Sequence, residues 1–198
     1  MTEQLIMLIV FLFPLAYSPG PGNMFFAATG ARFGIIPTLP ASAGYHVATW
    51  IVTYAIGTGL LTIVDTAPLV TSVMQVLGAL YVLWIAYSFV RADATMEHVD
   101  TKSVRFWDGV VLMILNPKAY AIIAMMFSQF LPQNDNRTVL GTAAITTIFT
   151  VNNLVAFTLW TLLGDRLAIL FDSPQRAAIL NNAFGFILAG VALWMLFW

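Results

Sequence analysis

The chain contains no cysteine and few charged residues, and each shortage excludes a class of function. Without cysteine it can form no disulfide, iron–sulfur cluster or thiolate zinc site. Charged residues make up 9% of its 198 residues, whereas soluble domains carry about 25%. The net charge of −1 offers no basic face for nucleic acid. Hydrophobic residues make up 60% of the chain and the mean hydropathy is +0.88, so we expect lipid to be its main solvent.

Enzyme motifs are also absent from the sequence. It has no G-x-S-x-G, no H-E-x-x-H and no paired aspartates within an apolar stretch. We therefore expect neither enzymatic activity nor a cofactor or metal site. The N-terminus lacks a basic region and a small-residue cleavage site, so residues 5–17 are not expected to form a cleaved signal peptide.

Six apolar stretches predict transmembrane helices, because a span needs about 20 mostly apolar residues. They lie at about residues 5–30, 37–63, 68–90, 108–131, 138–163 and 178–198, with polar breaks at 31–36, 65–67, 91–107, 132–137 and 164–177. Residues 5–17 alone would reach only about 20 Å as a helix, short of a hydrocarbon core of about 30 Å. We therefore favour a broken first span that resumes after the break over a re-entrant pair.

The longest polar break, residues 91–107, divides the chain into two sets of three spans. An odd number of spans per half gives inverted topology, as in many transporters. The predicted fold is an all-α integral membrane protein with a single transmembrane domain over residues 1–198, built from inverted repeats at about 1–90 and 108–198. Six lysines and arginines flank one set of loops and only Arg137 the other, which places loop 91–107 in the cytoplasm and both termini outside.

Proline and glycine interrupt the first and fourth spans, which are equivalent positions in the two repeats. The interruptions lie at residues 18–23 and 116–118. Broken helices leave backbone groups unpaired, which costs several kcal/mol in lipid unless protein, water or ligand satisfies them. Two ordinary proline kinks are the alternative interpretation. The candidate substrate-binding residues are Pro19, Gly20, Pro21, Gly22, Asn23, Asn116, Pro117, Lys118, Asn152 and Asn153.

The candidate residues are predicted to converge at one depth. At about 1.5 Å per residue, Lys118, His46 and Asn152 each lie about 14–15 Å from the cytoplasmic ends of their spans. A lysine there costs about 2.5–3.5 kcal/mol unless its head snorkels to an interface, so Lys118 is a candidate partner for a carboxylate. Carbonyls freed by the prolines, those of Leu15, Tyr17 and Met113, are candidates for binding an ammonium group. No carboxylate lies in mid-span, which favours neutral amino acids or similar small zwitterions.

Proton coupling has three candidate residues. His46 is the best titratable group within a span, because the reference pKa of histidine is near 6.5. Its alternative role is a hydrogen bond between packed helices. Asp65 and Asp108 stand at span ends, where they serve as gates or as ordinary helix caps.

These motifs resemble the LysE/RhtB family of bacterial amino-acid exporters over nearly the whole chain. The matching pieces are Ser18-Pro19-Gly20-Pro21, Gly78-Ala79-Leu80-Tyr81 ahead of Arg91, Phe106-Trp107, Leu115-Asn116-Pro117-Lys118-Ala119 and the region of Gly185. The resemblance implies a bacterial inner-membrane protein that exports amino acids or close metabolites by antiport with protons. One departure is Gly22, which stands where the family often has Asp or Asn. It removes a carboxylate that would handle a cation or proton.

Two other functions remain open from the sequence. One is an ion or small-solute channel on the same scaffold, and the other is a membrane assembly protein without transport. Small residues such as Ala41, Gly44 and Gly57 favour close helix packing, and part of that surface is a candidate homodimer contact.

Overall fold

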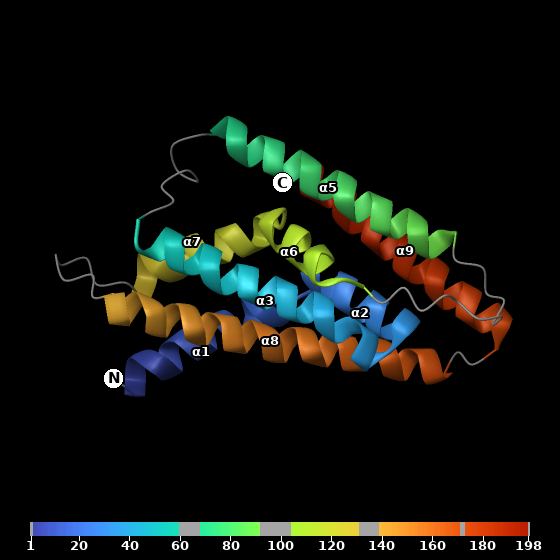
Figure 1. Ribbon diagram of the computed structural model, residues 1–198, viewed down its shortest axis with the longest axis horizontal. Coiled ribbons are helices and arrows are strands. Elements are labelled where there is room, and N and C mark those ends of the chain that lie inside the picture. The colour runs from blue at the N-terminus through green and yellow to red at the C-terminus, as the bar shows by residue number, and fades with distance from the viewer. Residues whose placement is uncertain (1, 60–67, 92–103, 131–138, 171–172, 198) are drawn as a thin grey trace.

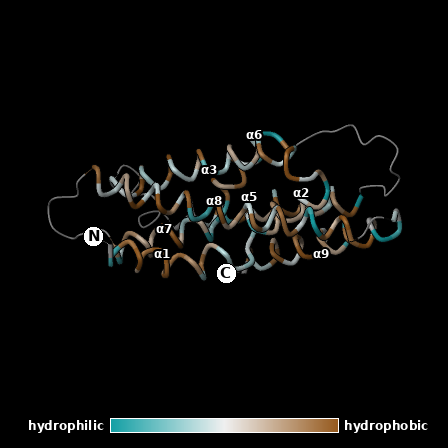
Figure 2. Tube along the Cα trace, turned by 90° about the horizontal axis from the view of Figure 1, so that it is seen from below, coloured by the Kyte–Doolittle hydropathy of each residue, from teal (hydrophilic) through white to brown (hydrophobic). Residues whose placement is uncertain are grey.

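The computed structural model describes residues 2–59, 68–91, 104–130, 139–170 and 173–197, and every regular element in these ranges is an α-helix (Figure 1). The helices are α1 Thr2–Tyr17, α2 Pro21–Phe33, α3 Ile35–Gly57, α5 Pro68–Val90, α6 Phe106–Ile114, α7 Pro117–Phe130, α8 Val139–Leu170 and α9 Pro174–Phe197. Hydrophobic residues run along α1 and along most of α9 (Figure 2). Because all regular elements in the described ranges are helices, the predicted all-α class is confirmed.

Both predicted interruptions are breaks between helices. The α1–α2 pair and the α6–α7 pair each bend by 62°. The first break is shorter than predicted, because α2 already begins at Pro21. Proline is tolerated at the first helical position, where its missing N–H would have no partner. In the same way α7 begins at Pro117, so Gly22, Asn23 and Lys118 lie in first helical turns rather than in the breaks.

Length and composition identify up to four membrane spans among the described residues. Val139–Leu170 and Ala178–Leu196 each suffice alone, and each bent pair suffices as one broken span. The helices α3 and α5 fall outside this set. The number of six spans and their inverted repeat stay predictions.

Two predicted loops are shorter in the structure. The predicted break at 31–36 reduces to Gly34, whose φ of 82° is a left-handed conformation that favours glycine. The predicted break at 164–177 is wrong at both ends, because α8 continues to Leu170 and α9 already begins at Pro174. The last turns of α8 stay helical since Leu167 and Ala168 pack against the hydrophobic core.

The broken spans are held by close backbone packing at the ends formed by α2 and α6. All of α2 from Pro21 to Gly30 is buried, and this helix lies along α8, while α6 lies along α3. A Cβ added at Gly44 would overlap the Phe106 carbonyl, and one at Gly109 would overlap the Ala41 carbonyl. These glycines let α3 and α6 approach until their backbones touch. The helices α5 and α9 pack on each other as a pair beside this bundle (Figure 1).

Candidate functional site

The Lys118 ammonium group joins the two breaks. Its Nζ donates to the Ser18 carbonyl at 2.7 Å, to Ser18 Oγ at 3.0 Å and, at the limit of hydrogen-bond distance, to the Pro19 carbonyl at 3.4 Å. Lys118 stands in the first turn of α7, and its acceptors lie between α1 and α2. A cation from one bent helix pair is thus satisfied by oxygens exposed at the break of the other.

The carbonyls predicted to be free have other partners. Leu15 O accepts from Ser18 Oγ at 3.2 Å, and Tyr17 O accepts from the indole of Trp160 at 3.2 Å. Met113 O accepts from the backbone N–H of Asn116 at 3.1 Å. These three carbonyls are therefore not left without partners, and their binding of a substrate ammonium group stays a prediction. The carbonyls of Ser18 and Pro19 hold a cation instead.

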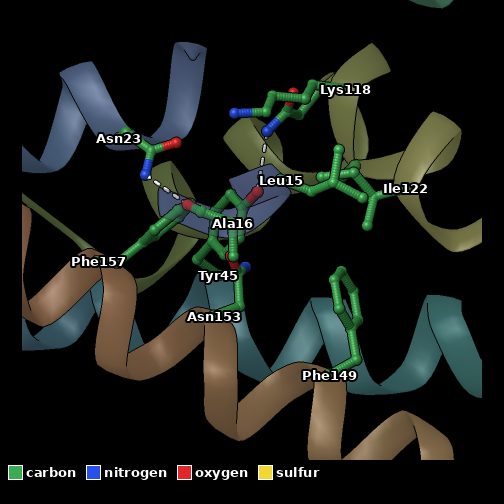
Figure 3. A pocket seen from close by; sticks show the side chains of 11 residues that line it. Leu15, Ala16, Asn23, Tyr45, Lys118, Ile122, Phe149, Asn153 and Phe157 are labelled. Atoms are coloured by element: carbon green, nitrogen blue, oxygen red, sulfur yellow. Dashed lines mark hydrogen bonds between the residues drawn. The ribbon is translucent and has the colours of Figure 1, made fainter. Parts of the chain in front are cut away.

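A small pocket lies beside Lys118, where α1, α2, α3, α7 and α8 meet (Figure 3). Four of the predicted residues, Asn23, Asn116, Lys118 and Asn153, share it. Its volume is about 20 Å³, roughly the space of one water molecule. The residues that line it are Leu15, Ala16, Asn23, Tyr45, Asn116, Lys118, Ala119, Ile122, Phe149, Asn153 and Phe157.

Amide side chains fix the polar wall of this pocket. Asn116 Nδ2 donates to the Tyr45 hydroxyl at 2.9 Å, and Asn23 Nδ2 donates to the Ala16 carbonyl at 2.9 Å. The Asn116 Oδ1 atom is buried and has no hydrogen-bond partner within the described part of the chain. An unpaired buried acceptor costs about 1–3 kcal/mol. The pocket therefore presents a cation, through Lys118, and an open acceptor, through Asn116.

The other predicted binding residues surround the pocket without lining it. A Cβ added at Gly20 would lie 2.7 Å from Lys118 Cδ, and one at Gly22 would lie 2.5 Å from Phe157 Cζ. Both glycines leave room for those side chains. Pro19 and Gly20 face a groove against α9 instead. Asn152 is half-buried beside Asn153, and its Nδ2 has no partner among the described residues.

The two coupling or gating candidates that the structure describes, His46 and Asp108, are not among the residues that line the Lys118 pocket. His46 Nδ1 lies 2.7 Å from the Ser42 carbonyl, and its ring packs against Tyr45 and Phe157 with centroids 5.4 Å and 5.6 Å away. Asp108 Oδ2 accepts the backbone N–H of Arg105 at 2.7 Å, so one carboxylate oxygen caps α6. Asp65 lies outside the described residues.

Sequence reasoning missed the aromatic part of the pocket. Tyr45 is fully buried and binds Asn116, and Phe157 closes the side behind Gly22. One signal was present, because Tyr45 precedes His46 and therefore lies at the same predicted depth. Phe157 follows Asn153 by one helical turn, but apolar residues fill most of α8 and give it no distinguishing pattern.

Fold and site together define an all-helical membrane protein in which two bent helix pairs meet through the Lys118 ammonium group. The LysE type translocator family model matches residues 13–197. The chain belongs to this family of bacterial membrane proteins, whose members are transporters and not enzymes.

Curated relatives agree with that family. The homoserine/homoserine lactone efflux protein of Salmonella typhimurium is 28% identical over 190 residues, covering 90% of each chain. The leucine efflux protein of Klebsiella pneumoniae is 27% identical over 122 residues, covering 59% of this chain and 58% of that protein. An uncharacterized membrane protein of Vibrio cholerae is 25% identical over 193 residues, covering 94% and 92%. No solved structure matches the chain.

Proposed function

We propose that this protein is a secondary exporter of neutral amino acids or related small zwitterions across the bacterial inner membrane. The relatives named for homoserine and leucine efflux support that substrate class. The observation that carries the proposal is the Lys118 ammonium group, which binds the exposed carbonyls of Ser18 and Pro19 beside a polar pocket. In this proposal six spans form two inverted repeats, both termini face outward, and the chain works as a homodimer.

Substrate binding is an exchange of partners in this proposal. The carboxylate of an amino acid takes the Lys118 ammonium group, since a carboxylate is a stronger acceptor than a carbonyl. The carbonyls of Ser18 and Pro19 then accept from the substrate's own ammonium group. The Lys118 ammonium group and the carbonyls of Ser18 and Pro19 keep a partner throughout, which avoids the cost of an unpaired group in lipid.

The pocket must widen for this exchange. Its volume of about 20 Å³ holds no amino acid. We therefore assign the structure to a contracted state of an alternating-access cycle, in which the two repeats move against each other around the breaks. Proton antiport drives the cycle, with His46 as the proton carrier because its Nε2 is buried and unpaired among the described residues.

Counterflow in proteoliposomes tests this function. Purified protein is reconstituted in vesicles loaded with L-leucine, L-homoserine, homoserine lactone or L-lysine, and uptake of the labelled compound is followed with and without a pH gradient. We expect saturable counterflow of the neutral amino acids, little of L-lysine, and a rate that rises with the pH gradient. Flux that does not saturate and needs no internal substrate would indicate a channel instead.

The coupling residue needs its own control. A His46→Gln variant keeps a polar side chain of similar size but loses the titratable imidazole. We expect it to retain counterflow, which needs no net proton movement, and to lose the response to the pH gradient. Undiminished gradient-driven transport in this variant would remove His46 from the coupling step.

A further inference from the structure

A second and larger cavity lies outside the predicted binding residues. It is enclosed by α2, the C-terminal half of α5 and the start of α6, and its volume is about 400 Å³. That value falls in the range of about 300–1,000 Å³ that is typical of small-molecule sites. It is lined by Phe25, Thr29, Arg32, Phe33, Tyr81, Trp84, Ile85, Ser88, Phe89, Val104, Arg105 and Asp108.

Arg32 supplies a fixed cation with donors to spare. Its Nη1 donates to the Ser88 carbonyl at 3.2 Å, and its guanidinium carbon lies 5.0 Å and 5.2 Å from the ring centroids of Phe33 and Phe89. No acidic side chain in the described ranges forms an ion pair with it. A guanidinium carries five N–H donors, so most of them stay open to a carboxylate, which it can bind through two parallel bonds.

Asp108 supplies the opposite charge in the same cavity. Only its Oδ2 is engaged, by the backbone N–H of Arg105, so its Oδ1 is left to accept another donor. The Tyr81 hydroxyl donates to the Asp108 carbonyl at 3.3 Å, which ties α5 to the start of α6 at this wall. A cation on α2 and an anion on α6 thus line one cavity, and aromatic rings share its lining.

We propose that this cavity is a collecting site for zwitterionic amino acids ahead of the Lys118 pocket. The substrate carboxylate binds Arg32, its ammonium group binds the Asp108 carboxylate, and its side chain lies among the rings of Phe25, Phe89 and Trp84. This inference rests on the proposed export function. It adds a site of adequate size at the membrane face from which the charge pattern predicts that substrate is taken.

The pairing of charges argues for an amino acid over an anionic lipid. In a partly desolvated cavity the Asp108 carboxylate would repel a phosphate headgroup, whereas it attracts the ammonium group of an α-amino acid. A lipid headgroup, including a zwitterionic one, is the competing occupant that the test must separate.

The absence of native cysteine allows a direct occupancy test. Ser88→Cys places one thiol on the cavity wall, and Ser128→Cys on α7 is the matched control outside it. Both serines are alike locally, since Ser88 Oγ bonds the Ile85 carbonyl at 2.7 Å and Ser128 Oγ bonds the Met125 carbonyl at 2.8 Å. The proteins are placed in nanodiscs of phosphatidylcholine, and the rate of labelling by N-ethylmaleimide is measured with L-leucine or L-homoserine added.

We expect amino acid at about ten times its dissociation constant to occupy about nine-tenths of the sites, and so to slow labelling of Ser88→Cys by about tenfold and leave Ser128→Cys unchanged. Leucinamide, which lacks the carboxylate, should not protect. Adding Arg32→Gln or Asp108→Asn should abolish protection, and the asparagine can still cap α6. Arg91→Gln should preserve it, because Arg91 stacks on Tyr87 outside the cavity. Lys118→Met should also preserve it.

Three results would overturn the collecting site. One is unchanged labelling at all amino-acid concentrations. Another is protection that appears only when phosphatidylethanolamine or phosphatidylglycerol is added, which identifies a lipid occupant. The third is protection that survives Arg32→Gln but disappears with Lys118→Met, which shows a remote effect of the central pocket. If counterflow is saturable but Ser88→Cys is not protected from labelling, only the collecting site is refuted. If Ser88→Cys is protected but no transport occurs, only the export function is refuted.

Discussion

The two breaks bend the chain by the same angle of 62° but contribute opposite chemistry. The first break, between Tyr17 and Pro21, contributes backbone oxygens through the carbonyls of Ser18 and Pro19. The second, between Ile114 and Pro117, contributes side chains, the ammonium group of Lys118 and the amide of Asn116. Two bent helix pairs of similar geometry therefore divide the site into an acceptor half and a donor half. The side chains of the donor half can be removed by substitution, whereas the backbone carbonyls of the acceptor half cannot.

Loss of the donor should have the largest effect. Lys118→Met removes the only cation at the breaks among the described residues, which is the proposed partner of the substrate carboxylate. A charge-assisted hydrogen bond is worth about 1.5–3 kcal/mol, so half-maximal counterflow should need about 100-fold more substrate. Lys118→Arg, which keeps the charge, should recover part of that loss. A Met variant with unchanged substrate dependence would separate Lys118 from binding.

The backbone acceptors of the first break can be disturbed only through geometry. Gly20→Ala adds a Cβ within 2.7 Å of Lys118 Cδ, so the ammonium group must shift from the carbonyls. Losing about one charged hydrogen bond corresponds to about a tenfold weaker substrate dependence in counterflow. Gly190→Ala is the matched control, because nothing lies within 4 Å of its added Cβ. Equal behaviour of the two variants would contradict the spatial requirement at the first break.

The amide of the second break should have a smaller effect, on stability. Tyr45→Phe removes the hydroxyl that accepts from Asn116 Nδ2 and leaves that buried donor unpaired. We expect a loss of about 1 kcal/mol in the free energy of unfolding, seen as a lower melting temperature in detergent. Tyr54→Phe on the same helix is the control, since Tyr54 stacks on Trp50 through its ring. An equal fall in melting temperature in both variants would show that the hydrogen bond from Asn116 to the Tyr45 hydroxyl adds no stability.

Ser18→Ala should have the smallest effect. It removes Ser18 Oγ at 3.0 Å from Lys118 Nζ and leaves both backbone carbonyls in place. A neutral acceptor of this kind is worth about 0.5–1.5 kcal/mol, so we expect a change of about threefold or less in counterflow. A loss as large as that of Lys118→Met would mean that the hydroxyl, and not the backbone, holds the cation.

The sequence predicts the breaks well because proline and glycine act locally. Pro19, Pro21 and Pro117 lack N–H groups wherever they lie, so their consequences need no tertiary information. The depth argument also brings Asn23, Asn116, Lys118 and Asn153 to one pocket. It does not separate Asn153 from Asn152, because neighbours on a helix share a depth and differ only in direction.

Other features depend on packing that no local pattern carries. The prolines free particular carbonyls, but which donors reach them depends on distant helices, as the indole of Trp160 reaching Tyr17 illustrates. The continuation of α8 to Leu170 depends on core contacts that override the polar residues Asp165 and Arg166. The Arg32 cavity depends on how α5 sits against α2 and the start of α6, which the sequence does not encode as a motif.

The backbone contact between α3 and α6 at Gly44 and Gly109 has a consequence for speed. Where a side chain closes a passage, rotation about one bond opens it within nanoseconds. Two backbones in contact have no such side-chain rotation, so α3 and α6 can separate only when a whole helix moves, on the scale of microseconds to milliseconds. Rotamer changes of single residues therefore leave this contact closed.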